Sequence, residues 1–536
     1  MPIPKKLPSF EIEGRLVRVD TEIRNKGGRG FAAGAVAMNA LDIAFIRAER
    51  EYTLQEVFAE GSQLPNLTSG AAETLMTLTF LRLVAMAACR PQTADDLKAL
   101  TNDEISRRVT VYLHNNRSLF ELQGDKPFLQ YPQAKAAKQG KTQECPTIGG
   151  FIPGFVSGNR GMINTNKYLS RPSQADRLRA LLFAVMMPFP GKKTDKSVWV
   201  SPNRSGSRKA FLSPMLGRNG IVHSFVRGKT LLDTVRLNMI CEADLKGSAF
   251  TEGFGVPAWE KMPLEDNQTA EQLRLSYFGQ LLPMLRFVLL DGDLIRPAFG
   301  VEPDDTIPVT TAAYGTDRNG NPRVVEMMSS TYWQALASSL GFTFKGSGVT
   351  TPSCQHLQWC LPRAKKDPTF SGVLLLGLRV TKATNGEMYF TGSDGPFMYR
   401  IPVQGNETRL EDKFTFMSML SATVYSCLAR IPESLACRSM TPEDEGKPSD
   451  AQQKNIRNYA DTHLRLILED LTDDFAELLC LTIDEEIEEF EREMAERARE
   501  AIHERIVCNG DRLIAKAGRI ELNVQSLFKS LKSEEG

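Results

Sequence analysis

Apolar residues recur with helical spacing in the first part of the chain. Thr68 to Cys89 (TSGAAETLMTLTFLRLVAMAAC) begins with capping-type residues and then has apolar positions on most sides of a helix. This pattern predicts a buried core helix. A second helix is predicted from Asp103 to Leu122, ending before Gly124 and Pro127, because glycine terminates helices and proline lacks a backbone N–H.

The middle of the chain is predicted to be β-rich. From about 284 to 405, β-forming runs alternate with turn sequences, which are DGD at 291–293, RNGN at 318–321 and TNGE at 384–387. Asn-Gly and Asp-Gly pairs between such runs are strong hairpin signals. We therefore expect a mixed, largely antiparallel sheet in this part of the chain.

The C-terminal part changes back to a helical pattern after about 408. Apolar residues recur there at steps of three, four and five, and they are Leu471, Phe475, Leu478, Ile483, Ile487, Phe490, Met494 and Ala498. One helical stripe facing a core accounts for that spacing. With the segments 414–428 and 456–471 it predicts an up-and-down bundle, with turns near 431–452 and 508–512.

These patterns predict an α+β fold, in which a large mixed N-terminal globular domain is followed by a C-terminal four-helix bundle. The boundaries that we expect are 41–405 for the globular domain and 406–536 for the bundle. Residues 1–40 are rich in Gly, Arg and small side chains without a sustained period, so we expect a flexible or loosely packed extension. A chain of 536 residues is long enough for two domains.

The composition indicates the cellular compartment more clearly than it indicates a binding partner. Lys+Arg and Asp+Glu both number 65, so the total charge does not indicate a polyanionic partner and only its distribution can. Nine scattered cysteines have no framework spacing, which indicates reduced thiols and a cytoplasmic protein. Neither a secretory leader nor a run of about 18 uncharged apolar residues is found, so we expect no membrane association.

Residues 132–230 are rich in Gly, Pro, Ser and Asn, and loops of such length are usually functional. The basic segment, GKKTDKSVWVSPNRSGSRK at 191–209, combines cations that neutralise phosphates with small residues that let a backbone approach a groove. Its candidate DNA-binding residues are Asn203, Arg204, Gly206, Ser207, Arg208 and Lys209. The alternative is an ordinary solvated surface loop.

Two more segments are candidates for nucleic-acid contacts. The polar segment, GNRGMINTNKYLSR at 158–171, offers amide, hydroxyl and cationic donors at Asn164, Thr165, Asn166 and Lys167, although the same residue types are common in ordinary loops. The Asn-Gly hairpin, LRVTKATNGEMYF at 378–390, presents Lys382, Thr384, Asn385 and Gly386 near its tip. Such a tip could act as a wedge between base pairs, although most hairpins of this type have no such role.

The sequence does not indicate an enzyme. The patterns GxSxG, HExxH and GxxxxGK[ST] are absent, and we predict neither catalytic residues nor a cofactor. Cys354, His356 and Cys360 occur together as CQHLQWC, but a tetrahedral zinc site needs a fourth ligand. A metal-dependent hydrolase that uses these three residues is the enzymatic alternative.

Several segments in order resemble the CasA-type large subunit of the type I-E CRISPR surveillance complex Cascade. They are LDIAFIRAEREYTLQEVFAEGSQLPNL at 41–67, LFELQGDKPFLQ at 119–130, HSFVRGKTLLDTVRLNM at 223–239, VPAWE at 256–260 and LSYFGQLLPMLRFVLLDGDLI at 275–295. The PFLQ sequence is the most specific match, and the FVRG element also matches at Arg227, Gly228, Thr234 and Asn238. The resemblance covers about 41–536, and the last 130 residues match only in helical character.

The resemblance implies a non-catalytic subunit that works with guide RNA (crRNA) and the other Cascade subunits. It implies recognition of the protospacer-adjacent motif (PAM) of target double-stranded DNA, help in opening the duplex for R-loop formation, and a docking surface for the helicase-nuclease effector. The family's glycine loop corresponds to Asn203–Ala210 and its wedge hairpin to Thr381–Glu387, while the polar segment corresponds to a loop near guide RNA. A scaffold subunit without direct PAM recognition is the alternative.

Overall fold

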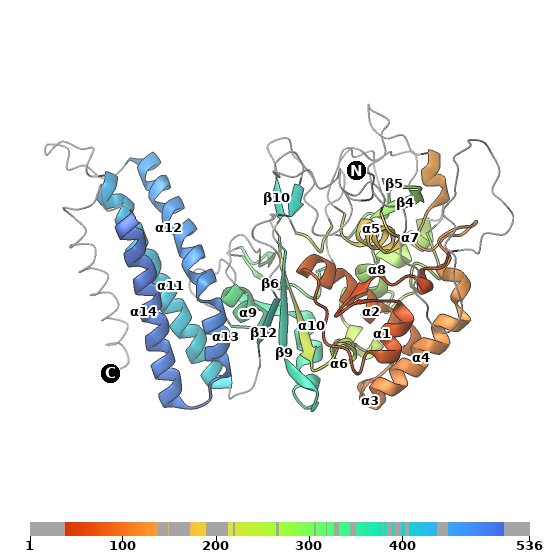
Figure 1. Cartoon of the computed structure of the whole chain (residues 1–536), viewed down its shortest axis with the longest axis horizontal. Coiled ribbons are helices and arrows are strands. Elements are labelled where there is room, and N and C mark those ends of the chain that lie inside the picture. Colours follow the sequence, from red (N-terminus) through yellow and green to blue (C-terminus); the bar gives the residue numbers. More distant parts are fainter. Residues whose placement is uncertain are drawn as a thin grey trace, which may run out of the picture. The chain divides into compact units, whose positions relative to one another are not determined.

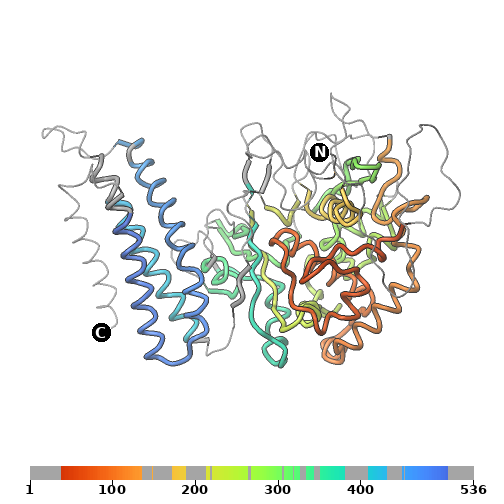
Figure 2. The backbone as a smooth tube through the Cα atoms, viewed as in Figure 1, coloured from red at the N-terminus to blue at the C-terminus, as the bar shows by residue number. Residues whose placement is uncertain are grey.

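The computed structural model describes residues 38–136, 148, 172–188, 213–217, 220–263, 267–304, 307–317, 319–325, 332–342, 350–378, 380–382, 388–390, 398–401, 407–436 and 449–508. All of them belong to one compact unit. Figure 1 shows its elements, and Figure 2 follows the backbone from the orange N-terminal elements to the blue C-terminal helices.

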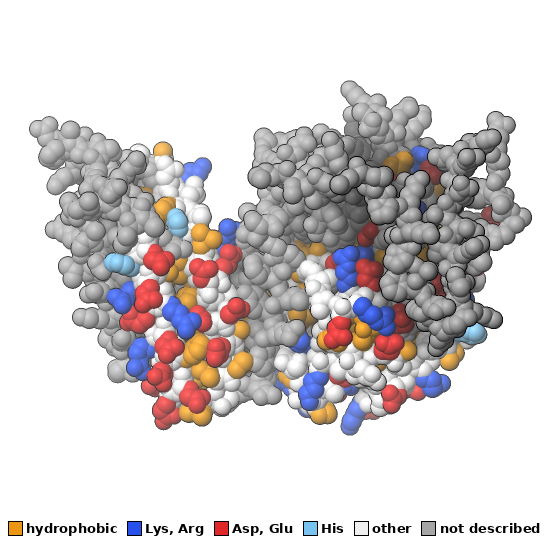
Figure 3. Space-filling view, viewed as in Figure 1, with side chains coloured by type: hydrophobic (Ala, Val, Ile, Leu, Met, Phe, Trp, Pro, Cys, Tyr) orange, Lys and Arg blue, Asp and Glu red, His pale blue; other side chains and the backbone are white. Residues whose placement is uncertain are grey.

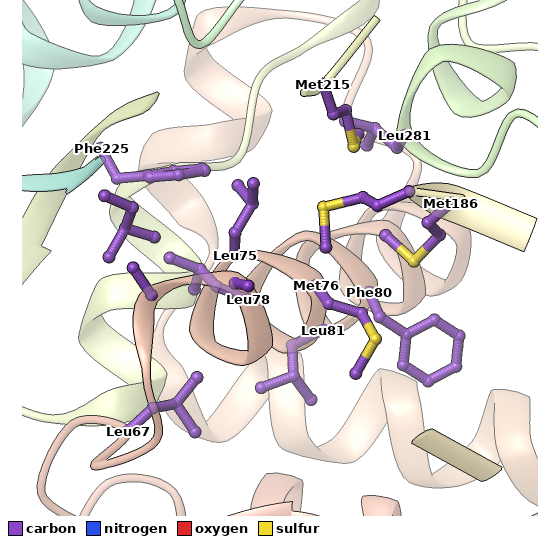
Figure 4. Close-up of a cluster of buried hydrophobic side chains, with 14 of the residues drawn as sticks. Leu67, Leu75, Met76, Leu78, Phe80, Leu81, Met186, Met215, Phe225 and Leu281 are labelled. Carbon is purple, nitrogen blue, oxygen red and sulfur yellow. The ribbon is translucent and has the colours of Figure 1, made fainter. Parts of the chain in front are cut away.

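Helix α2 (Ala71–Cys89) is the centre of the core, as the apolar pattern predicts. Every residue of this helix except Ala88 is buried, and its apolar side chains meet those of neighbouring elements in Figure 4. By length and composition α2 could cross a membrane, but 94% of its most apolar window is buried inside the protein. A helix that is apolar on all sides is a core helix when other elements cover it.

The elements around α2 come from the whole globular part of the chain. Before and after it in sequence lie β1 (Ile46–Arg47), β2 (Glu51–Tyr52), α1 (Leu54–Glu60), α3 (Ala94–Ala99) and α4 (Asn102–Asn115). Further along the chain come α5 (Gln174–Met186), α6 (Leu231–Leu237), α7 (Asn267–Arg274) and α8 (Tyr277–Leu281). Helices α4, α5, α6 and α8 all contact α2 directly.

The predicted end of the second helix is wrong by several residues. Helix α4 ends at Asn115, and a separate 3-10 turn follows at Arg117–Phe120. The cause is Asn116, whose side-chain amide donates a hydrogen bond of 2.9 Å to the carbonyl of Tyr112. A short amide side chain that satisfies a helix carbonyl competes with continuation of the helix.

The strands pair antiparallel, as predicted for the middle of the chain. Strand β9 (Phe370–Gly377) lies between β3 (Val222–Gly228) and β12 (Met398–Ile401). The other pairs are β4 (Arg286–Asp291) with β5 (Leu294–Phe299), β6 (Ala313–Thr316) with β7 (Pro322–Val324) and β8 (Thr350–Cys354), and β10 (Val380–Lys382) with β11 (Met388–Phe390). Strand pairing therefore confirms hairpins at all three predicted turns, although residues 383–387 of the third lie outside the described residues.

The prediction of a mainly β segment from 284 to 405 is incomplete. Helices α9 (Tyr332–Leu340) and α10 (Gln355–Ala364) also lie in this part of the chain. Moreover, β3 comes from the loop-rich region and pairs with β9, a long-range neighbour. Local patterns could not reveal that pairing, because partner choice in a sheet depends on side-chain packing between distant segments.

Among the described residues, four helices follow the strands, as predicted. They are α11 (Glu407–Ala436), α12 (Asp450–Asp470), α13 (Thr472–Cys480) and α14 (Asp484–Cys508). Helix α11 contacts each of the other three, and Figure 2 shows them side by side in blue. The predicted single stripe from Leu471 to Ala498 is wrong, because the helix breaks at the five-residue step between Leu478 and Ile483.

The break between α13 and α14 is stabilised by a buried cation. Leu481 is extended, with φ −67° and ψ 144°, and its carbonyl accepts a hydrogen bond of 2.7 Å from Nζ of Lys413 on α11. Burial lowers the pKa of Lys413. Because carbonyls at the end of a helix lack intrahelical partners, this lysine satisfies them and ties the connection to α11.

Two arginines among the described residues of the globular part are fully buried, and their surroundings differ. Arg179 on α5 forms ion pairs with Glu51, Glu73 and Asp176. Arg82 on α2 donates to the hydroxyl of Tyr277, and its Cζ lies 5.5 Å from the ring centroid of Phe225. Within the described part of the chain, its Nε and Nη1 have no hydrogen-bond partner and no carboxylate pairs with it.

We therefore predict opposite effects for two equivalent substitutions. Arg179→Met should lower the free energy of unfolding by about 3–5 kcal/mol, because it leaves buried Glu73 with less compensation. Arg82→Met should leave stability unchanged or raise it, because it removes an uncompensated buried charge. The measurement is the thermal unfolding midpoint, with Arg107→Met on the surface as a control for the removed charge. Equal losses for both buried positions would contradict the expected difference.

Candidate nucleic-acid interface

The predicted contact residues fall mostly outside the described residues. This holds for Asn164–Lys167, for Asn203–Lys209 and for Thr384–Gly386. Lys382 is described in its backbone only, as the last residue of β10, paired with Met388. The structure does describe residues that flank the three candidate segments, and these show which of the flanking residues lie close together.

Both ends of the basic segment are fixed to the core at one place. The chain leaves α5 at Met186 and is described again from Ser213, whose hydroxyl donates a hydrogen bond of 3.0 Å to the carbonyl of Met186. Figure 4 shows the side chains of Met186 and Met215 in a cluster of buried side chains that also includes Met76 of α2. All three methionines are buried. The two described residues that flank this segment, Met186 and Ser213, are therefore adjacent in the core.

His223 on β3 anchors the returning chain. Its Nε2 lies 2.8 Å from the carbonyl of Met215, and its Nδ1 lies 2.7 Å from the hydroxyl of Thr311. A carbonyl only accepts, so Nε2 carries the proton and the threonine hydroxyl donates to Nδ1. Complete burial lowers the pKa of His223 to about 4, which keeps the ring neutral at physiological pH.

The root of the Asn-Gly hairpin adjoins the same strand. Val222 pairs with Gly377, and the backbone N–H of Leu378 donates to the carbonyl of Ile221 at 2.9 Å. Strand β10 starts at Val380, two residues after Leu378. The return of the basic segment and the start of the hairpin are therefore held together by the β3–β9 pairing, although they are far apart in sequence.

The polar segment is anchored at the other end of α5. Ser173 caps this helix in a capping box with Asp176, and Nη2 of Arg177 lies 2.6 Å from Oδ1 of Asp293. The 13 residues of α5 correspond to about 20 Å at 1.5 Å per residue. The polar segment and the basic segment thus join opposite ends of one helix.

The FVRG element has a structural role at the strand-to-helix turn. A Cβ at Gly228 would lie 2.4 Å from Cβ of Asp233, so only glycine fits there. The N–H of Gly228 donates to the hydroxyl of Thr234. The side chain of Asn238 accepts from the N–H of Val226 at 2.8 Å and donates to the carbonyls of Val226 and Thr234. These bonds fix β3 to α6.

The PFLQ and PAW sequences also serve the core. Phe128 stacks on Phe120 with ring centroids 4.9 Å apart, and Trp259 lies 5.9 Å from Phe120. Gln130 is buried, accepts from the N–H of Leu290 at 2.9 Å and donates to the carbonyl of Leu122 at 3.0 Å. The residues with the most specific resemblance therefore build the scaffold that carries the candidate segments.

Cys354, His356 and Cys360 form part of the core near α6. His356 donates from Nε2 to Oδ1 of Asn238 at 2.9 Å, and the thiol of Cys354 donates to the carbonyl of Thr310 at 3.4 Å. Burial lowers the pKa of His356 and raises the pKa of Cys360 to about 11. In the described part of the chain, no three His, Cys, Asp or Glu residues are placed to hold a metal ion.

The described surface carries charges of both signs. On the face shown in Figure 3, acidic and basic side chains are intermixed over the helices and the globular part. Many of the arginines are paired, such as Arg107 and Arg108 with Glu104, whose pKa these hydrogen bonds lower to about 2.

Neither Ser213 nor His223 is identified as an anchor from the sequence. A histidine within the apolar strand sequence 221–226 was the available signal for a buried, hydrogen-bonded role.

Comparison with known proteins identifies the class of protein. The family model of the CRISPR-associated protein Cse1 matches residues 43–335, which is more than half of the chain. This match and the α+β fold with four C-terminal helices define a large subunit of the type I-E CRISPR complex Cascade. The chain belongs to the Cse1 family, whose members are also named CasA. A comparison with curated proteins gives no match.

Solved structures have the same fold at low sequence identity. Thermus thermophilus CasA (Cse1) is 17% identical, with a TM-score of 0.65, over 92% of this chain and 99% of that one. Cse1 from Acidimicrobium ferrooxidans is 14% identical, with a TM-score of 0.62, over 94% and 99%. A chain of a structure titled "CRISPR RNA-guided surveillance complex" is 14% identical, with a TM-score of 0.58, over 92% and 99%.

Replacing Asn238 should destabilise the scaffold strongly. Asn238→Leu leaves the N–H and carbonyl of Val226 and the Nε2 of His356 buried without this partner. Each buried polar group that loses its hydrogen bond costs about 1–3 kcal/mol. We expect a lower thermal midpoint and a lower yield of folded protein, and Asn102→Leu, at a half-buried position, serves as a control. A wild-type midpoint for Asn238→Leu would contradict this role.

Stability should fall in acid partly because of His223. The folded pKa of about 4 lies below the ordinary value of 6.5, so between these pH values the unfolded chain binds a proton that the folded chain does not. The contribution is complete above pH 6.5 and is lost as the pH falls towards 4. The thermal midpoint of His223→Gln, compared with that of the wild type from pH 7.5 to 4.5, should decrease less. Parallel curves would contradict the assignment.

Proposed function

We propose that this subunit recognises the PAM of target double-stranded DNA within an RNA-guided antiviral complex. Its partners are crRNA and the other Cascade subunits. It helps to open the duplex for R-loop formation, and it offers a docking surface to the helicase-nuclease effector. The observation that carries the proposal is the shared anchorage of the basic segment and the Asn-Gly hairpin on β3 and β9.

General chemistry supports contacts at these two segments. Lys and Arg neutralise phosphates, and small residues with free N–H groups allow close approach of a backbone to a groove. The minor groove distinguishes base pairs only partly, which suits recognition of a short motif. Guide pairing then supplies the remaining specificity, so the protein needs only a few base contacts. The basic segment carries Arg204, Arg208 and Lys209 for this purpose.

We also propose that this protein is non-catalytic and acts in the cytoplasm. Six cysteines among the described residues are free thiols, as a reducing compartment favours. The proposed division has an extension at 1–40, a globular domain at 41–405 that carries the DNA-contacting segments, and a bundle at 406–536. In this arrangement the bundle is the surface for neighbours and for the effector. The structure titled as a CRISPR RNA-guided surveillance complex supports assembly with RNA for a similar fold.

The decisive experiment is binding of a PAM library by the reconstituted complex with crRNA. Replacing Arg204, Arg208 and Lys209 by alanine should weaken binding, and the slope of log K against log salt should fall by about 0.9 for each phosphate that is no longer neutralised. Replacing Thr384 and Asn385 by alanine should impair duplex opening, followed with a fluorescent base analogue beside the PAM.

The matched control replaces three exposed lysines elsewhere, Lys98, Lys246 and Lys366, by alanine. It removes the same charge and should leave PAM discrimination unchanged. Wild-type binding and opening by both segment variants would refute the proposed contacts. A scaffold role would follow instead if only substitutions on the bundle surface, such as Lys454→Glu with Arg457→Glu, broke assembly or capture of the effector.

A further inference from the structure

We propose that Ser213 and His223 are positioning residues for DNA recognition. They form a clamp that holds the return of the basic segment in a fixed register with the Asn-Gly hairpin. Neither residue needs to touch nucleic acid, because both are completely buried. The inference rests on the proposed function and adds to it the residues that keep the two segments in place relative to each other.

The first half of the clamp is a short turn at the end of the basic segment. The N–H of Leu216 donates to the carbonyl of Ser213 at 3.0 Å, and the N–H of Gly217 donates to the carbonyl of Pro214 at 3.3 Å. The hydroxyl of Ser213 reaches back to the carbonyl of Met186, the last residue of α5. One buried hydrogen bond thus joins the two ends of the intervening chain, away from competing water.

The second half is the ring of His223, which connects three separate segments. It lies on β3, donates to Met215 in the turn, and accepts from Thr311 in the segment before β6. On the neighbouring strand its register partner is Leu376, two residues before Leu378. The turn and the root of the hairpin are therefore both tied to β3 within a few residues.

This arrangement fixes the described residues that flank both segments in the core. A segment whose ends are fixed loses less conformational freedom when it binds, so a larger part of the contact energy appears as affinity. Correct placement also matters more for a short, specific contact than for general attraction to phosphates. Loosening the clamp should therefore reduce discrimination between PAM and non-PAM targets more than it reduces non-specific binding.

The test uses Ser213→Ala and His223→Leu in the full chain, reconstituted with crRNA and partner subunits. Ser213→Thr and His223→Gln are the conservative variants, because they keep a hydroxyl and a side-chain N–H donor. We expect each disruptive variant to lower the ratio of PAM to non-PAM affinity about tenfold, the value of one typical hydrogen bond. The salt dependence should stay at the wild-type slope, because no cation is removed.

Two further measurements distinguish a positioning role from general destabilisation. They are rescue by the conservative variants and the effect of combining substitutions. The conservative variants should restore the ratio, and thermal midpoints measured alongside should show that Ser213→Ala remains folded. Adding Ser213→Ala to the variant without Arg204, Arg208 and Lys209 should cause no further loss, since the hydrogen bond of Ser213 joins the two residues that flank the basic segment. Full additivity, or failure of Ser213→Thr to restore discrimination, would overturn the inference.

The outcomes also separate this inference from the proposed function. If the clamp variants keep wild-type discrimination while the basic-segment variant loses it, the positioning role is refuted and PAM recognition stands. If the basic-segment variant keeps it as well, PAM recognition by this segment is refuted and the positioning role fails with it. Loss of discrimination in both, with rescue by the conservative variants, supports both proposals.

Discussion

The hydrogen bonds of the Asn238 amide hold strand β3, the strand to which the residues flanking the basic segment and the Asn-Gly hairpin are bound. Through them α6 holds both the N–H and the carbonyl of Val226, and His356 binds the same amide from α10. Strand β3 also pairs with β9 along its other edge. A strand fixed by a sheet and two helices is a rigid support, because each restraint removes a different direction of movement. The chain that follows the basic segment is bound to this strand at Met215, and the residue before the Asn-Gly hairpin is bound to it at Leu378.

The residues that match the family's sequence motifs are not the residues that are proposed to contact DNA. Gly228, Phe128, Gln130 and Trp259 lie in turns or in the core, where a steric limit or a buried hydrogen bond allows few replacements. The residues proposed to meet DNA belong to segments where phosphate contacts can be made by several side chains. Low identity with solved structures of the same fold agrees with such a division, since a scaffold needs only a small set of fixed residues.

Buried charged side chains fix how several helices and strands are placed relative to one another. Arg179 joins β2, α2 and α5 through three carboxylates, and Lys413 joins α11 to the connection between α13 and α14. Each group is costly to bury, so its partners must be in place when the chain folds. These interactions set the relative position of elements that apolar packing alone would leave less defined. Arg82 donates one hydrogen bond, to Tyr277, so it restricts the position of these elements less than Arg179 and Lys413 do.

Local sequence patterns were enough to predict the elements that depend on neighbouring residues. The core helix at 68–89, the hairpin turns, the C-terminal helices and the family motifs all follow from periodicity, turn chemistry or short residue strings. The pairing of β3 with β9, the break after Cys480, and the contacts of Met215 and Leu378 with β3 follow only from the folded structure. Those features depend on interactions between distant residues, and a hydrogen bond such as that from Ser213 to Met186 leaves no periodic signal in the chain.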